Sequence, residues 1–269
     1  MGSKILDECM AKYGEFFEKN KINLEVDNIL NGRSFFRKSN YKKVLDDIYF
    51  YLVILNDGNS YGFSYYNKTK KETSPIKYIN KNPIKTINKL KNLPLKVAML
   101  DSIAGKYNEI NKIKPNYRIY YKGDMKKRAE IRSKELTKGI KKNEKVLLVG
   151  AVSEIVKDLI KKGAKVKVTD LSIKRKKTEI SGTKIEVGNE NTMKLIKKCD
   201  TAIVTGATLT SNTMDKILRY SKKINLIFYL ETGSNLSQEI IKKGAKKVIS
   251  EKFPYYDMPN SLYFDVYEK

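Results

Sequence analysis

The sequence predicts an α/β protein, in which a Rossmann-like, doubly wound and mostly parallel sheet follows a smaller N-terminal α+β domain. Two observations favour this fold. From residue 145 onward, short apolar runs rich in β-branched residues alternate with amphipathic helical segments. Before residue 122, helical segments surround two strand-like aromatic runs. We therefore expect an α+β domain at residues 1–122 and a Rossmann-like, cofactor-binding domain at residues 123–269.

The N-terminal part contains a hairpin pattern. Residues 48–55 are aromatic and β-branched, which is typical of a strand, and the Asn-Asp-Gly-Asn sequence at 56–59 indicates a turn. Aromatic residues then alternate with small ones over 61–65, as in a half-buried second strand. Helical patterns at 8–20 and at 84–106, the latter interrupted by a proline, complete the predicted α+β domain.

A charged, helix-prone segment at 124–132 follows, and Gly139 is expected to end its helix. We interpret this segment as a connector helix with a solvated charged face. A contact with nucleic acid is the alternative.

The C-terminal part alternates strands with helices, as expected for parallel βαβ units with right-handed crossovers. Ser153 and Asn212 are expected to cap the two helices that they precede, and Asn235 with Gln238 resembles a capping box. The predicted strands are 145–150, 166–170, 185–187, 201–206, 224–230, 247–249 and 262–266, and the predicted helices are 154–162, 192–198, 213–220 and 235–243.

The composition excludes several kinds of function. The chain has no histidine, so a catalytic triad or metal site built on histidine is excluded. Cys9 and Cys199 are far apart in sequence and form no CxxC pair, so we expect no structural metal. No apolar run is long enough to cross a bilayer and the N-terminus lacks a signal-peptide core, so we expect a cytoplasmic protein without membrane contact.

The net charge is +25, from 55 basic and 30 acidic residues in a chain of 269. Such a balance suits an anionic partner such as RNA, DNA or a phosphorylated metabolite. The lysines are spread along the whole chain and form no stripe, however, which favours a compositional bias over a nucleic-acid surface.

Ligands of a doubly wound sheet bind beyond the carboxyl ends of its strands, at the point where the strand order reverses. Asp170 ends the second predicted strand, 20 residues after Gly150 ends the first. A carboxylate at this place can accept hydrogen bonds from an adenosine ribose. A helix cap or a surface acid is the alternative for Asp170.

The loop after the first strand departs from the dinucleotide fingerprint G-x-G-x-x-G. Only Gly150 matches, because Val152 and Ile155 occupy the other two glycine positions. Fewer glycines leave less room for a pyrophosphate against the backbone. The loop therefore argues against NAD and is compatible with an adenosine ligand without phosphates, such as S-adenosylmethionine.

The segment 205–212 holds many small and hydroxyl-bearing residues just after a predicted buried strand. Small residues let a ligand approach the backbone, and hydroxyl groups can bind a carboxylate. The alternative is an ordinary polar loop that ends in a helix cap.

These features resemble the heavy-metal-chelation proteins. In their Rossmann-like domain a glycine-ended first strand, an acid ending the second strand and a Thr-Gly-x-x-x-x-x-Asn segment recur; here these are Gly150, Asp170 and residues 205–212. The hairpin and the helix around residues 98–102 are similar to their smaller N-terminal unit. The two-domain length, the lysine-rich composition and the unusual first loop are more similar to the HcgC-type pyridinol C-methyltransferases, which act in iron-guanylylpyridinol cofactor biosynthesis for Fe-hydrogenase in methanogens.

The resemblance implies a homodimer that binds S-adenosylmethionine and methylates carbon 3 of a hydroxypyridinol. It leads us to expect a cofactor site at Gly150, Ala151, Asp170, Leu171, Thr205, Gly206 and Thr208. Substrate contacts are expected from Asn212 and from the aromatic residues Tyr51, Tyr61 and Phe63. The alternative for these three aromatic residues is the core of the hairpin. No catalytic residue is assigned.

Three other functions remain open. A metal- or metallophore-handling protein would need clustered carboxylates, and the sequence shows no such cluster. An RNA-binding methyltransferase would suit the charge, but no recognised RNA module is present. A nicotinamide-dependent reductase is disfavoured by the glycine-poor first loop.

Overall fold

We describe the protein from a computed structural model. It describes residues 3–37, 45–67, 74–121, 125–171, 179–188, 190–252 and 263–269. The expected domain boundary at 122–123, together with Asp124 and Leu262 of the predicted elements, lies outside these residues.

The chain forms two compact units. Unit 1 comprises residues 1–114 with two short later segments, 209–212 and 231–236. Unit 2 comprises residues 115–208, 213–230 and 237–269. The division thus differs from a single break near residue 122, because two loops of the C-terminal part cluster with unit 1.

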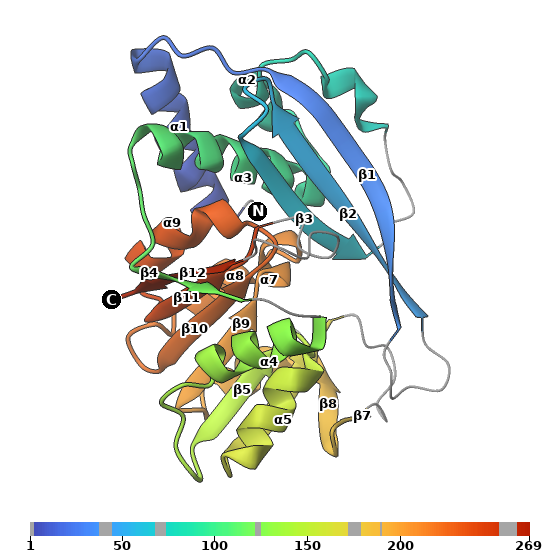
Figure 1. The fold of residues 1–269 in the computed structure, drawn as a ribbon, viewed down its shortest axis with the longest axis vertical. Coiled ribbons are helices and arrows are strands. Elements are labelled where there is room, and N and C mark those ends of the chain that lie inside the picture. The colour runs from blue at the N-terminus through green and yellow to red at the C-terminus, as the bar shows by residue number, and fades with distance from the viewer. Residues whose placement is uncertain are drawn as a thin grey trace. The chain divides into compact units, whose positions relative to one another are not determined.

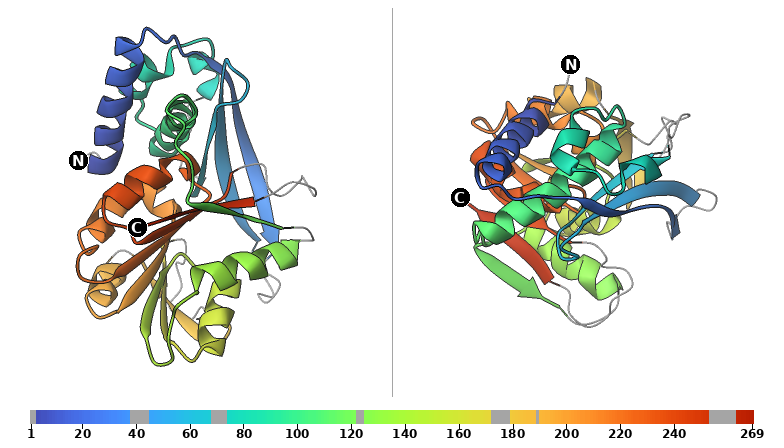
Figure 2. Two further views of the ribbon diagram at one scale, coloured as in Figure 1. Left: turned by 60° about the vertical axis from the view of Figure 1, so that its left-hand side comes forward. Right: turned by 90° about the horizontal axis from the view of Figure 1, so that it is seen from above.

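Unit 1 is an antiparallel sheet of order β1-β2-β3 with helices on one side, as Figures 1 and 2 show. The predicted hairpin is present as β2 and β3. Pro94, expected to interrupt a helix, stands in the first turn of α3, where proline is well tolerated. The elements are α1 (Lys4–Lys19), β1 (Val26–Arg37), β2 (Leu45–Leu55), β3 (Tyr61–Asn67), η1 (Pro75–Tyr78), α2 (Pro83–Ile87), α3 (Leu93–Ile110) and η2 (Ser234–Leu236).

The sheet of unit 1 lies directly against the backbone of α3. A Cβ atom at Gly62 would lie 2.1 Å from the carbonyl oxygen of Ala98 and 2.1 Å from the amide nitrogen of Ser102. Only glycine permits this close approach of strand and helix. The small residue within the aromatic alternation of β3 therefore has a packing role.

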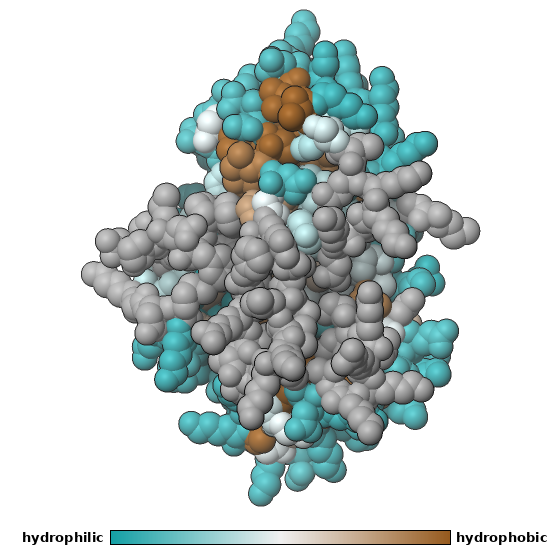
Figure 3. All heavy atoms as spheres, turned by 90° about the vertical axis from the view of Figure 1, so that its right-hand side faces the viewer, coloured by the Kyte–Doolittle hydropathy of each residue, from teal (hydrophilic) through white to brown (hydrophobic). Residues whose placement is uncertain are grey.

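A hydrophobic surface is present on unit 1. On the face of the molecule in Figure 3, hydrophobic side chains gather over this unit. Among the large hydrophobic side chains of unit 1 that the structure describes, Leu30, Ile76 and Ile110 are exposed.

Unit 2 contains a nine-stranded sheet of order β4-β12-β11-β10-β9-β5-β6-β8-β7. Helices α4 and α5 cover one face, where Leu136, Ile155 and Leu159 pack against the strands. The elements are β4 (Tyr117–Tyr120), α4 (Met125–Leu136), β5 (Lys145–Val149), α5 (Ser153–Lys161), β6 (Lys165–Asp170), β7 (Glu179–Ile180), β8 (Thr183–Val187), α6 (Glu190–Ile196), β9 (Thr201–Thr205), α7 (Ala207–Thr210), α8 (Met214–Leu218), β10 (Asn225–Leu230), α9 (Ser237–Lys242), β11 (Lys247–Ser250) and β12 (Tyr263–Glu268).

The six strands β8, β6, β5, β9, β10 and β11 are parallel neighbours. Numbered by their order in the chain, they are arranged 3-2-1-4-5-6, which is the strand order of Rossmann dinucleotide-binding folds. Strands β12 and β4 extend one edge in antiparallel orientation. The prediction of an α/β fold with a mostly parallel, Rossmann-like sheet and a smaller α+β part is therefore confirmed.

The structure corrects three predicted caps. Ser153 does not cap the helix that was expected to follow it, because α5 begins at Ser153 itself, with Val152 as the N-cap residue and no side-chain capping bond. The helix expected after Asn212 begins at Met214, with Thr213 as the N-cap residue, and the side chain of Thr213 makes no capping bond. Asn235 does not cap the last helix either. Its side-chain amide nitrogen instead donates to the backbone carbonyl oxygens of Tyr61 and Asp101 within unit 1.

Candidate functional site

The candidate site lies where the strand order of unit 2 reverses, between β5 and β9. Val149 of β5 pairs with Thr169 of β6 on one side and with Val204 of β9 on the other. The residues that follow these strands therefore meet at one edge of the sheet. This edge brings together six of the seven predicted cofactor residues, namely Gly150, Ala151, Asp170, Leu171, Thr205 and Gly206.

Gly150 turns the chain away from β5 in a backbone conformation that favours glycine. Its φ is +99°, and its amide donates to the carbonyl oxygen of Thr169 at 2.8 Å. A Cβ atom at this position would lie 2.3 Å from the Thr205 hydroxyl oxygen. The Thr205 side chain thus packs against Gly150, and Val152 stands at the position of the second glycine, which in dinucleotide folds lets a pyrophosphate approach the backbone.

The Asp170 carboxylate is held at the end of β6 by the neighbouring loop. Its Oδ2 atom accepts a hydrogen bond of 2.8 Å from the amide of Ala151, and its carbonyl oxygen accepts one of 3.0 Å from Gly188. The side chain of the next residue, Leu171, is 46% exposed. An oriented carboxylate therefore lies beside an open apolar side chain, which suits a ribose next to a flat base.

The loop after β9 differs from the prediction, because residues 207–210 form the short helix α7. The Thr208 hydroxyl is buried and donates to the carbonyl oxygen of Thr205 at 2.8 Å, with the Met214 sulfur 3.6 Å away. The hydroxyl of Thr208 thus serves the short helix, and its expected role in cofactor binding stays a prediction. Gly206 donates to the carbonyl oxygen of Tyr229 at 2.9 Å and closes the end of the strand.

The predicted substrate residues all belong to unit 1, and two of them form its core. Tyr51 is fully buried and stacks on Tyr66 with 4.8 Å between ring centroids, and its hydroxyl accepts a hydrogen bond of 3.2 Å from Asn92. Phe63 is 1% exposed and packs edge-on against Tyr65. Packing inside unit 1 thus accounts for both rings, as the alternative of a hairpin core expects, and a role of either ring in substrate binding stays a prediction.

Tyr61 is half-buried at the start of β3, and its carbonyl oxygen accepts a hydrogen bond of 3.0 Å from Asn235. Asn212 adopts a left-handed backbone with φ +57° in the segment that clusters with unit 1. The proposed role of either residue in substrate binding stays a prediction.

Sequence reasoning missed a buried polar cluster in unit 2, made of Tyr121, Arg128, Arg132, Tyr229 and Glu251. Glu251 follows β11 and is 1% exposed; Arg128 of α4 is 3% exposed and forms an ion pair with it. The Tyr229 hydroxyl donates to Glu251 Oε2 at 2.6 Å and accepts from Arg132 Nη1 at 2.7 Å. Burial, together with the Glu251 charge, raises the pKa of Tyr121.

The cluster borders the candidate site. Tyr229 is the in-register partner of Thr205 on the adjacent parallel strand, so the two side chains lie on the same face of the sheet. The guanidinium of Arg132 lies 4.7 Å from the centroid of the Tyr229 ring, a cation–π contact. The spacing of Arg128, Arg132 and Leu136 by four residues, which places them on one helix face, was the signal in the sequence.

Among the residues that the structure describes, no three His, Cys, Asp or Glu side chains come together in a group that could hold a metal ion. Burial raises the pKa of the Cys199 thiol to about 11, which disfavours the thiolate that binds metals. Within the same residues, no helix combines the length and apolar character needed to span a bilayer.

The fold and this site place the protein among Rossmann-like α/β proteins. Residues 134–233 match the sequence model of the DUF364 family, described as "Putative heavy-metal chelation". The match runs from the end of α4 through β10 and so includes every predicted cofactor residue.

Solved structures of DUF364 proteins are similar to this chain over nearly its full length. A protein of unknown function from Desulfitobacterium hafniense has a TM-score of 0.63 at 11% identity, covering 98% of this chain and 100% of its own. One from Pyrococcus horikoshii has a TM-score of 0.58 at 16% identity, with the same coverage. These likenesses show a shared fold. No curated protein matches the sequence.

Proposed function

We propose that unit 2 binds S-adenosylmethionine at the ends of β5, β6 and β9, and that the protein is a C-methyltransferase acting on carbon 3 of a hydroxypyridinol. The observation that carries the cofactor part is the Asp170 carboxylate, oriented by Ala151 at the switch point of a Rossmann-ordered sheet. The acceptor rests on the resemblance to the pyridinol C-methyltransferases.

The crowding at Gly150 supports a nucleoside without a diphosphate. Because Val152 replaces the second glycine of the fingerprint and Thr205 packs against Gly150, a pyrophosphate lacks the close approach that it makes in dinucleotide folds. A sulfonium nucleoside needs the ribose carboxylate but no phosphate cradle. The residues present therefore fit this cofactor better than they fit NAD.

Two residues of the site would contact the cofactor directly. Asp170 would accept the ribose hydroxyls, and Leu171 would flank the adenine. When bound, the cofactor supplies an electrophilic methyl group. The chain then has to orient the acceptor and favour its ring anion, and orientation alone contributes up to ~7–11 kcal/mol in well-fitted systems. The positive charges of Arg128 and Arg132 border the site and would favour an anionic acceptor, although the adjacent Glu251 offsets one of them.

Metal handling is the second candidate, and the family match over residues 134–233 favours it. Because no trio of metal ligands exists among the described residues, the metal would arrive inside a small chelating molecule that the protein binds. The same edge of the sheet would hold such a molecule.

Calorimetric titration with S-adenosylmethionine, S-adenosylhomocysteine, NAD and Ni²⁺ supplied as its citrate chelate distinguishes these functions. We expect saturable binding of the two adenosyl compounds and none of NAD. In Asp170→Asn the amide oxygen can still accept from Ala151, but the charged acceptor for the ribose is lost. We expect this variant to bind S-adenosylhomocysteine about 1–3 kcal/mol more weakly.

Asp200→Asn is the matched control. Its carboxylate accepts a hydrogen bond of 2.9 Å from the backbone amide of Lys145, where β5 begins. The site lies at the other end of this strand, so the change is chemically equivalent and remote from the site. Tight binding of Ni²⁺ or NAD without any response to the adenosyl compounds would overturn the proposal. Equal losses in both variants would remove the role of Asp170. A homodimer, which the resemblance suggests, is tested by sedimentation.

A further inference from the structure

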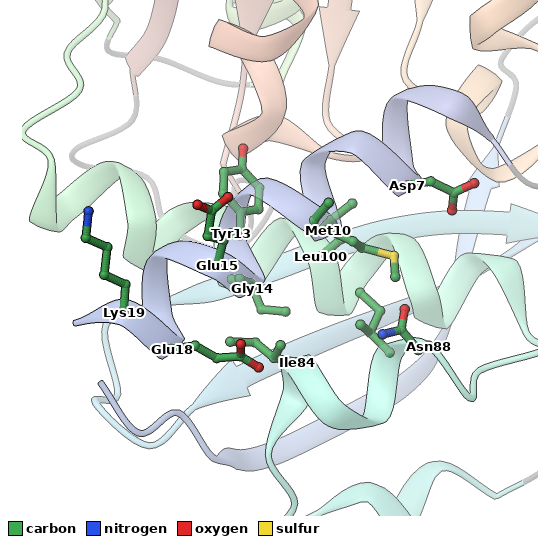
Figure 4. A pocket seen from close by; sticks show the side chains of 13 residues that line it. Asp7, Met10, Tyr13, Gly14, Glu15, Glu18, Lys19, Ile84, Asn88 and Leu100 are labelled. Atoms are coloured by element: carbon green, nitrogen blue, oxygen red, sulfur yellow. The ribbon is translucent and has the colours of Figure 1, made fainter. Parts of the chain in front are cut away.

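Unit 1 contains a pocket of about 770 Å³ between α1, α2 and α3. Residues of α1 form one side, and Ile84 of α2 and the next residue after that helix, Asn88, lie across from them, as Figure 4 shows. The volume falls within the range of small-molecule sites, ~300–1,000 Å³. Nothing in the proposed function uses this pocket.

The floor of the pocket is apolar. Leu100 and Ile103 of α3 and Ile87 of α2 are buried beneath it, and the partly exposed Met10 lines it from α1. Gly14 lies on the pocket side of α1, where an added Cβ would be 3.6 Å from the nearest atom of Ile84. The absence of a side chain at Gly14 therefore keeps this stretch of the pocket open.

The rim of the pocket is mainly acidic, although the chain as a whole is basic. Three acids, Asp7, Glu15 and Glu18, line the pocket, against a single base, Lys19, in a protein with 55 basic and 30 acidic residues. Asp7 is paired with Lys96 at 3.6 Å. Glu15 and Glu18 are exposed and form no ion pair within the described residues. Two carboxylates without an ion pair thus stand over an apolar floor, with Lys19 as the one base on the rim.

We propose that this pocket binds a small organic cation, a protonated amine carried on an apolar body. The apolar part would cover Leu100 and Ile103, which removes apolar surface from water. The ammonium group would lie at the rim beside Glu15 and Glu18, where opposite charges attract. A neutral molecule of the same shape would lack the attraction to the two carboxylates. An anionic molecule would be repelled by them.

Titration with 4-phenylbutylammonium, followed by NMR chemical shifts, tests the proposal on the full chain. The matched probes are 4-phenylbutan-1-ol and 4-phenylbutyrate, which share the apolar body and differ in charge. We expect saturable binding of the ammonium, weaker binding of the alcohol by about tenfold, and no binding of the carboxylate. Added salt should weaken the binding of the ammonium alone, because the rim is exposed.

Two pairs of variants locate the binding. Glu15→Gln with Glu18→Gln should weaken ammonium binding about tenfold, whereas Glu8→Gln with Asp27→Asn removes the same charge from unit 1 outside the pocket and should not. Gly14→Leu should abolish binding by filling the pocket, and Gly14→Ala, whose methyl group meets only ordinary contact, should retain it.

Equal binding of the alcohol and the ammonium would overturn the charge assignment. Unchanged binding in a folded Gly14→Leu protein, or no saturable binding of any probe, would overturn the site itself. Neither result bears on S-adenosylmethionine, which is titrated separately, so the two proposals fail independently.

Discussion

At the scale of single residues, Gly150 is the position where the backbone and the site constrain each other most closely. Its positive φ and the 2.3 Å distance from an added Cβ to the Thr205 hydroxyl each exclude a side chain. We expect Gly150→Ala to lower the free energy of unfolding by about 2–4 kcal/mol. Denaturant unfolding measures this change.

Gly139→Ala separates the two causes. Gly139 also has a positive φ, +83°, but nothing lies within 4 Å of an added Cβ. We expect this variant to lose only about 1 kcal/mol, the backbone part of the effect. Equal losses in the two variants would mean that Thr205 moves aside without cost.

Asp57, in the turn between β2 and β3, makes stability depend on pH. Burial alone would raise its pKa, but hydrogen bonds from Lys106, from the Ser60 amide and hydroxyl and from the Asn59 amide together lower the pKa to about 2. Because this value lies below the ordinary one of 3.8, ionised Asp57 stabilises the fold at neutral pH. That contribution is lost as the pH falls from about 4 to about 2.

The measurement compares the unfolding free energies of the wild type and Asp57→Asn across this range. We expect the difference between them to shrink as the pH falls below about 4. Asp27→Asn, on the exposed part of β1, is the control for the loss of one carboxylate from unit 1. A difference that stays constant down to about pH 2 would contradict the role of Asp57.

At the scale of elements, a buried carboxylate on α3 joins three parts of unit 1. Asp101 is fully buried; its Oδ2 accepts from the Phe63 amide of β3 at 2.9 Å and its Oδ1 from the Asn235 amide of η2 at 2.7 Å. The segment 231–236 is thereby attached to the helix and the strand.

Asp101→Ala would leave two buried amides without their acceptor. We expect the free energy of unfolding to fall by about 2–5 kcal/mol, since each unsatisfied buried group costs ~1–3 kcal/mol. Asn108→Ala removes one hydrogen bond of 2.8 Å to the same segment and should cost only about 1 kcal/mol. Guanidinium unfolding with hydrogen exchange at residues 231–236 measures both effects. Protection that survives in Asp101→Ala would contradict the attachment.

The sequence predicted elements well where their pattern is local. Strands β5, β9 and β10 are apolar runs bounded by turns, β6 alternates lysine with valine, and all four occur where expected. Strand β1 was missed because Asn, Gly and Arg interrupt its pattern, although it pairs with β2 along its whole length. A strand of this kind is defined by its pairing with β2, and its own residues give little signal of that pairing.

The candidate site was predictable in part for the same reason. Gly150 and Asp170 follow apolar strands at a spacing that the fold itself requires, so their meeting at one edge could be expected. Thr208 and Tyr51 could not be placed, because hydroxyl groups and aromatic rings suit both a ligand and the interior. Their burial is a property of the neighbours that pack around them.

At the scale of the whole molecule, the charge of +25 is spread along the chain. We expect an unstructured RNA oligonucleotide to bind weakly at about 50 mM salt and to dissociate fully by about 300 mM, because distributed lysines release counterions without forming a sequence-reading surface. Fluorescence anisotropy over a salt series measures this. Binding that persists at about 300 mM salt would favour the RNA-binding alternative.

The division into units also emerges only at this scale. The strand–helix rhythm correctly placed a Rossmann-like sheet in the C-terminal half, but residues 209–212 and 231–236 cluster with unit 1. Residues of connecting segments, such as Asn235, can form the hydrogen bonds of their backbone and side-chain groups with any nearby surface. The order of residues along the chain does not indicate which surface that is.

Periodicity and spacing alone determined the class of fold, the order of the parallel strands of unit 2, and the loops that approach one another where these strands end. The tertiary structure decided which polar groups those loops expose. Thr205 fills the space above Gly150, Thr208 turns inward, and Arg132 reaches Tyr229 from a helix distant in sequence. Side-chain periodicity fixes which face is buried, whereas occupancy of a site depends on contacts between distant residues that only packing brings together.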